Sequence, residues 1–181
     1  MSILKVARMG HPVLRTHARP LERAEVKSPR IQTFIDDMIE TMTEYRGVGL
    51  AAPQVHEGLR VFVALLDEPD AGDPEDEGST SEPVVVINPE ITIVDPKIVE
   101  DWEGCLSIPD IRGRVPRARE IVVRALDRRG SSIEIHAVDF QARVIQHETD
   151  HLDGILFFDR MRDFGSLTFL EEYAKYWRRT D

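Results

Sequence analysis

Two histidines and a glutamate in the C-terminal third of the chain have the spacing of a metal site. His147, Glu148 and His151 form the pattern His-Glu-x-x-His in a run that reads as helix. Residues four apart lie on the same face of a helix, so both imidazoles can point at one metal ion. Glu148 projects over the same region. Two neutral nitrogen ligands beside a carboxylate that can take a proton from water are what a metal hydrolase needs.

The flanking residues support a helix here rather than a chance match among surface or core residues. Asp139 is a candidate N-cap and Gly154 a good helix terminator. Apolar residues recur between them at roughly helical spacing: Phe140, Val144, Ile145 and Leu152. A catalytic site also needs a third ligand and donors for an oxyanion, which must come from elsewhere in the chain.

Composition predicts one globular domain spanning residues 1–181. The hydrophobic fraction is 41% and the charged fraction 31%, as in water-soluble proteins. No apolar run approaches the roughly 20 residues of a membrane span. The N-terminus lacks the apolar core and cleavage site of a secretory signal. We therefore expect a cytoplasmic protein without a membrane partner.

The net charge of −10 comes mostly from one segment. Residues 67–83 carry eight acidic residues and no basic one, and the rest of the chain has 23 basic against 25 acidic residues. Such a segment cannot bury apolar surface, so we predict a mobile acidic surface loop. Because no basic stripe is present, a dedicated DNA-binding groove is not expected.

The remaining patterns predict an α+β fold. A helix is predicted at residues 29–45, with Ser28 as its N-cap and Pro29 in its first turn, and it carries one apolar stripe. Strands are predicted at residues 60–66, 84–88, 91–94, 120–126, 132–137 and 155–158, and a final helix at 166–179. We expect mostly antiparallel strands packed around a central metal-binding helix, with flanking N- and C-terminal helices.

Two further segments offer the missing chemistry. Cys105, the single cysteine, would complete a His/His/Cys set with one position left for water. Gln54 follows the glycine-rich run that starts at Gly47 and could donate its amide. Together with a backbone N–H near Leu106 it would make an oxyanion hole. The alternative is that Cys105 is a buried small hydrophobe and the glycine-rich run a tight turn.

Three segments together resemble the signature motifs of peptide deformylases, in the same order. They are Gly-Val-Gly-Leu-Ala-Ala-Pro-Gln at 47–54, Glu-Gly-Cys-Leu-Ser at 103–107 and Gln-His-Glu-Thr-Asp-His at 146–151. The similarity also includes Gly10–Leu14 and the run from Ser107 to Asp127. It therefore covers most of the chain except the acidic segment and the C-terminal helix.

The resemblance implies a ligand set and a reaction. Cys105, His147 and His151 would hold a divalent metal, iron(II) in the cell, with zinc, nickel or cobalt in some preparations. Glu148 would take a proton from the metal-bound water, and the hydroxide would attack the formyl carbon of an N-formylmethionyl peptide. Gln54 and the Leu106 N–H would hold the oxyanion with the metal, and formate would leave.

The substrate peptide would lie along backbone near Val48, Gly49 and Glu103. Arg112 would meet it further along. The methionine pocket would be lined by Val48, Val144 and the aliphatic part of Arg143. We expect Asp150 to pair with an arginine such as Arg117 and to steady the ligand helix.

Three features depart from the family pattern. Thr149 stands where an aliphatic residue is common, which affects packing but no chemistry. His56 stands where a glycine is frequent, so the loop conformation there is open. The acidic segment at 67–83 has no counterpart in compact members.

Two other functions would use part of the same pattern. A generic zinc endopeptidase would take a third His or Glu downstream of His151, and none lies at the right offset. A metal-stabilised binding module would close its site with four protein ligands, whereas only three are evident.

The expected partners are nascent formylmethionyl chains and the ribosome near its exit tunnel, contacted through Lys175, Arg178 and Arg179 of the C-terminal helix.

Overall fold

The structure, a computed structural model, describes residues 2–66 and 82–178. Most of the predicted acidic loop therefore lies outside the described residues. The elements in chain order are η1 (Pro12–Arg15), α1 (Arg23–Val26), α2 (Pro29–Glu44), β1 (Gly49–Ala51), η2 (Ala52–Val55), β2 (Val61–Ala64), β3 (Val84–Cys105), β4 (Ile108–Leu126), β5 (Ser132–Val138), α3 (Asp139–Leu152), α4 (Phe157–Arg160), β6 (Thr168–Phe169) and α5 (Leu170–Tyr176). Among the described helices, none combines the length and apolarity needed to cross a bilayer.

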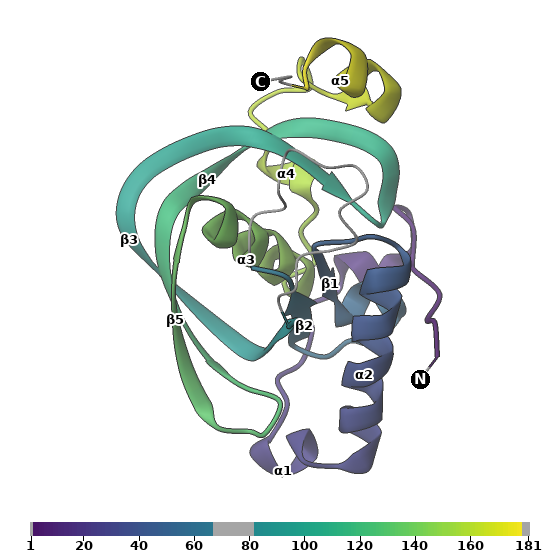
Figure 1. Cartoon of the computed structure of the whole chain (residues 1–181), viewed down its shortest axis with the longest axis vertical. Helices are drawn as coiled ribbons and strands as arrows, with labels where there is room; N and C mark the ends of the chain where they lie inside the picture. The colour runs from purple at the N-terminus through teal and green to yellow at the C-terminus, as the bar shows by residue number, and fades with distance from the viewer. Residues whose placement is uncertain (1, 67–81, 179–181) are drawn as a thin grey trace.

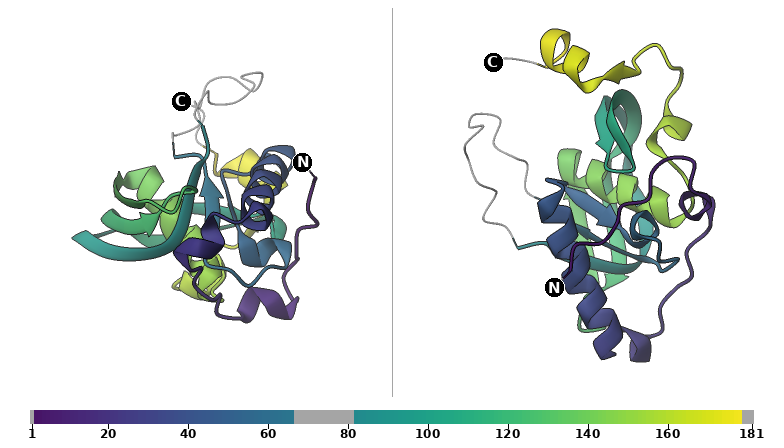
Figure 2. Two further views of the ribbon diagram at one scale, coloured as in Figure 1. Left: turned by 90° about the horizontal axis from the view of Figure 1, so that it is seen from below. Right: turned by 90° about the vertical axis from the view of Figure 1, so that its right-hand side faces the viewer.

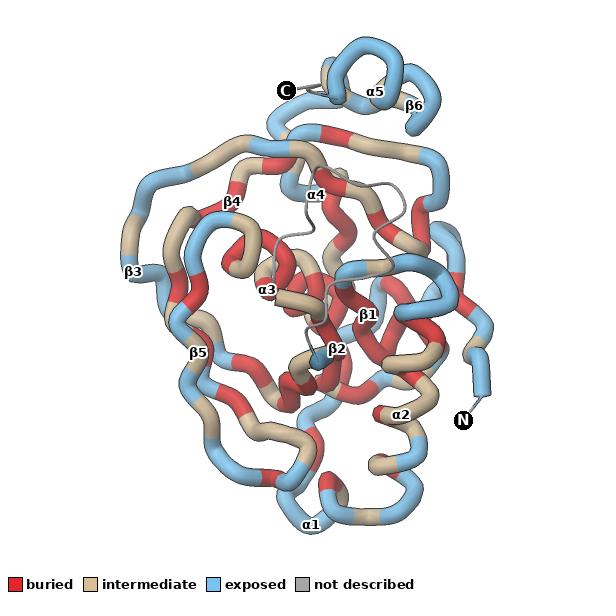
Figure 3. Tube along the Cα trace, in the orientation of Figure 1, coloured by how far each residue is buried: buried red, intermediate tan, exposed pale blue. Residues whose placement is uncertain are grey.

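One antiparallel sheet organises the molecule and confirms the predicted α+β class. Its strands follow the order β1-β2-β3-β4-β5, and the short β6 pairs separately with β4. The two longest strands, β3 and β4, form a curved hairpin that wraps around the central helix α3, while α2 lies on the other side of β1 and β2 (Figures 1 and 2). The sheet thus surrounds α3, and burial is concentrated along α3 and the inner strands (Figure 3).

Helix α2 forms as its sequence predicts. The Ser28 side chain accepts a hydrogen bond from the Ile31 N–H, and Pro29 occupies the first turn. The apolar stripe, including the fully buried Ile35, Met38 and Met42, packs on β1 and β2. This packing holds β1 and the glycine-rich turn before it in place.

Helix α3 also forms as predicted, but its first residue differs. Val138 is the N-cap, and Asp139 is the first helical residue, with a φ of 48° and an ion pair to Arg119. Asp139 is therefore not the predicted cap. Gly154 follows the helix with a φ of 72°, and a Cβ there would lie 2.8 Å from the backbone carbon of Arg15. A glycine is required at this position on both counts.

The predicted strands at 84–88 and 91–94 are one continuous strand, β3. Pro89 lies between the two predicted segments, and a proline cannot donate a hydrogen bond to a ladder. Asn88 instead adopts a φ of 53°, and the register shifts between Ile87 and Glu90, so a bulge absorbs the proline. Sequence reasoning also missed the first half of β4.

The C-terminal predictions needed two corrections. Residues 155–158 do not form a strand, because the Asp159 carboxylate accepts the Leu156 N–H and starts the short helix α4. The helix predicted at 166–179 begins only at Leu170. The two residues before it pair with β4 instead, through Ile111↔Phe169 and Arg112↔Thr168.

Candidate active site

The predicted ligand residues converge. His147 and His151 lie one turn apart on α3, with ring centroids separated by 5.0 Å, and Cys105 ends β3 beside them. The possible ligand atoms of all three lie within 4.8 Å of one another. Cys105 Sγ is 3.2 Å from His151 Nε2. Two ligands of a tetrahedral metal at bonds of about 2.3 and 2.1 Å would be about 3.5 Å apart, so these residues fit a metal ion.

A buried carboxylate orients the first histidine. His147 Nδ1 donates to Glu103 Oε2 at 2.8 Å, which leaves Nε2 free to bind a metal. Glu103 is itself held by two bonds of 2.9 Å from Arg117 and one of 2.8 Å from Arg143. Burial alone would raise the pKa of Glu103, but the hydrogen bonds from His147 and Arg117 hold that pKa well below its usual range. Glu103 therefore stays ionised and fixes the histidine tautomer.

Helix α3 is tied to β4 by a second carboxylate. Asp150 accepts hydrogen bonds from Arg117 Nη1 and, at 2.7 Å, from Arg160 Nη2. Arg117 thus joins Glu103 and Asp150, and all three side chains are buried. The predicted pairing of Asp150 with Arg117 is confirmed. The Arg143 guanidinium donates to Glu103 and to the backbone carbonyls of Val99 and Val115, contacts that sequence reasoning did not predict.

The Glu148 carboxyl group is buried and has few hydrogen-bond partners. It is 4% exposed, and its Oε2 has no hydrogen-bond partner among the described residues. Burial raises its pKa to about 7. A carboxyl group with a pKa near neutrality can both accept and return a proton, which is the property required of a general acid–base. Burial also lowers the pKa of His151, which favours the neutral imidazole that binds metal.

Gln54 faces the ligand cysteine. Its Oε1 accepts the Ala51 N–H at 2.8 Å, and this bond orients Nε2 toward Cys105 Sγ at 3.5 Å and Ser107 Oγ at 3.3 Å. The side chain is 1% exposed. The amide donor therefore lies beside the metal ligands, where an oxyanion donor is needed.

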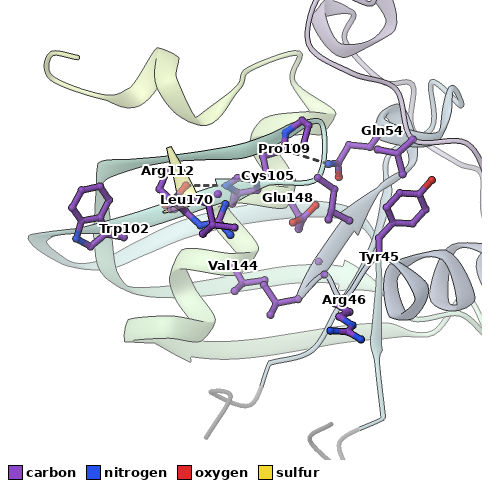
Figure 4. Close-up of a pocket in the computed structure, with 18 of the residues that line it drawn as sticks. Tyr45, Arg46, Gln54, Trp102, Cys105, Pro109, Arg112, Val144, Glu148 and Leu170 are labelled. Atoms are coloured by element: carbon purple, nitrogen blue, oxygen red, sulfur yellow. Dashed lines mark hydrogen bonds and ion pairs between the residues drawn. The ribbon is translucent and has the colours of Figure 1, made fainter. Parts of the chain in front are cut away.

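A cavity of about 500 Å³ opens over these groups (Figure 4). Nearly all the predicted residues line it: Val48, Gly49, Gln54, Glu103, Cys105, Leu106, Arg112, Arg143, Val144, His147 and Glu148. His151 lies behind them and is 1% exposed. The cavity thus brings together Cys105, His147, the Glu148 carboxyl group and the Gln54 amide, with His151 directly behind them.

Other lining residues were missed. Phe140 lies one helical turn before Val144, so the spacing on α3 could have revealed it. Gly104 lies under Arg112, and a Cβ there would be 2.0 Å from Arg112 Nη1. Trp102 and Leu170 face the cavity from β3 and α5 (Figure 4). No local pattern identifies Leu170, because its position depends on contacts far along the chain.

Comparisons with known proteins agree with this geometry. The polypeptide deformylase family matches residues 3–166. Peptide deformylase 2 of Nostoc sp. is 42% identical over 173 residues, covering 96% of this chain and 94% of the relative. The crystal structure of peptide deformylase from Thermotoga maritima has a TM-score of 0.79 at 38% identity, covering 90% of this chain and all of the other. A Met-Ala-Ser-bound peptide deformylase from Acinetobacter baumannii has a TM-score of 0.80 at 40% identity, covering 89% of this chain and 100% of that one.

Proposed function

Because this chain belongs to the peptide deformylase family, we propose a role for each residue around its cavity. The reaction is metal-dependent hydrolysis of the formyl group from the N-formylmethionine of newly made polypeptides, which releases formate. The observation that carries the proposed roles is the convergence of Cys105, His147 and His151 beside the buried Glu148.

Cys105, His147 and His151 would hold the metal. When bound there, a divalent cation supplies Lewis-acid charge, which acidifies water and polarises the formyl carbonyl. Glu103 holds His147 in the tautomer that leaves Nε2 available as a ligand.

Glu148 acts as the general base and then as the general acid. It takes a proton from the attacking water and delivers it to the methionine nitrogen as the C–N bond to the formyl group breaks. The Gln54 amide and the Leu106 backbone N–H donate to the oxygen that becomes negative. The peptide lies along Val48 and Gly49, with Phe140 and Val144 against the methionine side chain.

The ligand assignment can be tested by metal content. Cys105→Ala and His151→Ala should each lower both the bound metal per chain and formate release from an N-formylmethionyl dipeptide. Lys5→Ala is a suitable surface control, since Lys5 lies outside the cavity. Full metal content in either ligand variant would contradict the assignment.

We propose iron(II) as the metal in the cell, with zinc, nickel or cobalt able to replace it, because a thiolate and two imidazoles accept all four. Iron(II) beside a thiolate should make the enzyme sensitive to oxygen. Iron-loaded protein is then expected to lose activity in air faster than nickel-loaded protein. Equal decay of both would argue against this sensitivity.

We further propose that residues 1–181 act as one catalytic domain in the cytoplasm, close to the ribosomal exit tunnel. Helix α5 contains no buried residue and carries Lys175, with Arg178 just after it (Figure 3). The predicted Arg179 lies outside the described residues. A Lys175→Glu/Arg178→Glu variant should bind ribosomes more weakly than wild type, and unchanged binding would remove this docking surface.

A further inference from the structure

The N-terminal segment at residues 4–9 lies against the active site although it forms neither a helix nor a strand. Figure 2 shows the chain running here from the side of α2 toward η1. The side chains of Val6 and Arg8 line the cavity. Ala7, between them, is 2% exposed and packs in the same apolar cluster as Cys105. The segment is therefore part of the wall around the reacting groups.

Two backbone hydrogen bonds join this segment to the groups proposed to hold the oxyanion. The Ala7 N–H donates to the Gln54 carbonyl at 2.7 Å, and the Met9 N–H donates to the Ser107 carbonyl at 2.8 Å. Gln54 carries the amide donor. Ser107 directly follows Leu106, whose backbone N–H is the second donor. Each bond therefore fixes the chain at, or next to, one of the two oxyanion donors.

The two donors come from elements that no strand pairing joins. Leu106 and Ser107 form the turn between Cys105, which ends β3, and Ile108, which begins β4. Gln54 lies in η2, outside the sheet. One side-chain contact links them directly, from Gln54 Nε2 to Ser107 Oγ at 3.3 Å. The two bonds from the N-terminal segment are shorter, so this segment sets where the hairpin turn lies relative to η2.

Met9 makes its bond at the start of a tight turn. The His11 N–H donates to the Arg8 carbonyl at 3.0 Å, and Gly10 has a φ of 102°. These features define a type II turn with Met9 at its second position, where proline is favoured because its fixed φ fits. The Met9 residue is 56% exposed. A proline at this position would therefore delete the N–H and disturb little else.

We propose that the backbone N–H groups of Ala7 and Met9 hold the two oxyanion donors in the relative position that the reaction requires. Ala7 and Met9 are thus positioning residues, because they act through Gln54 and Leu106 and touch no reacting atom. The inference rests on the proposed function and adds to it a role for the N-terminal segment.

The test compares Met9→Pro with Met9→Ala, which keeps the backbone N–H, as metal-loaded full chains. We would measure kcat and KM for an N-formylmethionyl dipeptide, and the metal content and thermal midpoint of the same samples. Met9→Pro should have a kcat about tenfold lower than Met9→Ala and a similar KM. Loss of a whole oxyanion donor costs about 100- to 1,000-fold, and a misplaced donor should cost less.

Metal content should be the same in both variants, and the thermal midpoint of Met9→Pro should be close to that of Met9→Ala, because proline suits the turn. An equal kcat in the two variants would overturn the proposal. A loss of bound metal in Met9→Pro that accounts for its lower kcat would also overturn it.

A double-mutant cycle separates positioning from a general structural effect. With Gln54→Ala in the background, one of the two donors is gone and their relative position no longer matters. The ratio of kcat between Met9→Ala and Met9→Pro should then fall from about tenfold to about twofold or less. A ratio that stays at about tenfold would overturn the proposal, since the proline would then act independently of the oxyanion donors.

Amide hydrogen exchange in metal-loaded wild type tests the two bonds without turnover. The N–H groups of Ala7 and Met9 should exchange at least about tenfold more slowly than that of Arg8, which has no acceptor among the described residues. Exchange of the Met9 N–H as fast as that of Arg8 would overturn the proposal, even if Met9→Pro fails to fold. Failure of wild type to release formate would contradict the proposed function, and the positioning role with it.

Discussion

Gly49 lies directly against the carboxyl group of Glu148. A Cβ built on Gly49 would be 2.3 Å from Glu148 Oε1 and 2.9 Å from its Cγ. These separations are far below a normal contact between atoms. The glycine in β1 is therefore required because the Glu148 carboxyl group occupies the space that any side chain would need.

Gly49→Ala should reduce kcat strongly while leaving the metal bound. The added methyl group must displace the Glu148 carboxyl group, and a displacement of about 1 Å can cost about 100-fold in rate. Formate release and metal content would be measured together. Gly58→Ala is the control, because nothing lies within 4 Å of a Cβ at Gly58. Equal activity of the two variants would show that the carboxyl group tolerates the methyl.

Asp150→Ala should weaken metal retention by about 10- to 100-fold, since residues that orient metal ligands have effects of this size. The substitution leaves Arg117 without one of its two buried partners, which should also cost about 3 kcal/mol of folding stability. Metal affinity would be measured by chelator competition. Asp36→Ala removes an ion pair with Arg128 that is 40% exposed on each side. This control should change neither quantity appreciably, and unchanged retention in Asp150→Ala would refute the orienting role.

The buried Glu148 should make the stability of metal-stripped protein depend on pH. Its pKa is raised from 4.5 to about 7 by burial, so between these values the folded state keeps a proton that the unfolded state releases. The contribution of Glu148 to the free energy of unfolding should therefore be largest below pH 4.5 and should fall as the pH rises to about 7. Urea unfolding of wild type and Glu148→Gln would be compared across this range. The variant should lack this contribution, and parallel curves for the two proteins would contradict the raised pKa.

Thr149→Val should stabilise the protein by about 1 kcal/mol, because an unpaired buried hydroxyl carries a desolvation cost. Thr149 is 9% exposed, and its Oγ1 has no hydrogen-bond partner among the described residues. The two side chains have nearly the same shape, so packing should be preserved. Thr43→Val is the comparison variant, because the Thr43 hydroxyl already has a partner: its Oγ1 donates a hydrogen bond to the Ile39 carbonyl. Thermal unfolding would distinguish them, and a lower midpoint in Thr149→Val would disprove the expected gain.

Local spacing predicted the parts of the site that a single helix fixes. His147 and His151 meet because they are four residues apart, and Asp150 lies on the side of α3 that faces Arg117. Spacing along one helix cannot identify a residue that another strand contributes to the site. Cys105 was a candidate third ligand as the single cysteine, and the resemblance to a known motif favoured that role over a buried small hydrophobe. The hydrogen bond from Arg143 to Glu103 was not foreseen.

The fold was predicted where a signal is local and missed where it depends on distant contacts. His56 shows why a glycine is frequent at its position, since its φ is 68°. The β3 bulge at Asn88 and the pairing of Phe169 with Ile111 depend on neighbours that periodicity does not reveal. Leu170 belongs to the same class, because its place in the cavity lining depends on contacts far along the chain.

The most direct test of the central claim is formate release by Glu148→Ala. Wild type and variant would be loaded anaerobically with iron(II) or nickel, and metal content would be measured on the same samples used for turnover of an N-formylmethionyl dipeptide. We predict turnover by wild type and a loss of at least about 100-fold in the variant with the metal still bound. Comparable turnover by the fully loaded variant would contradict the role of Glu148 as the group that moves the proton.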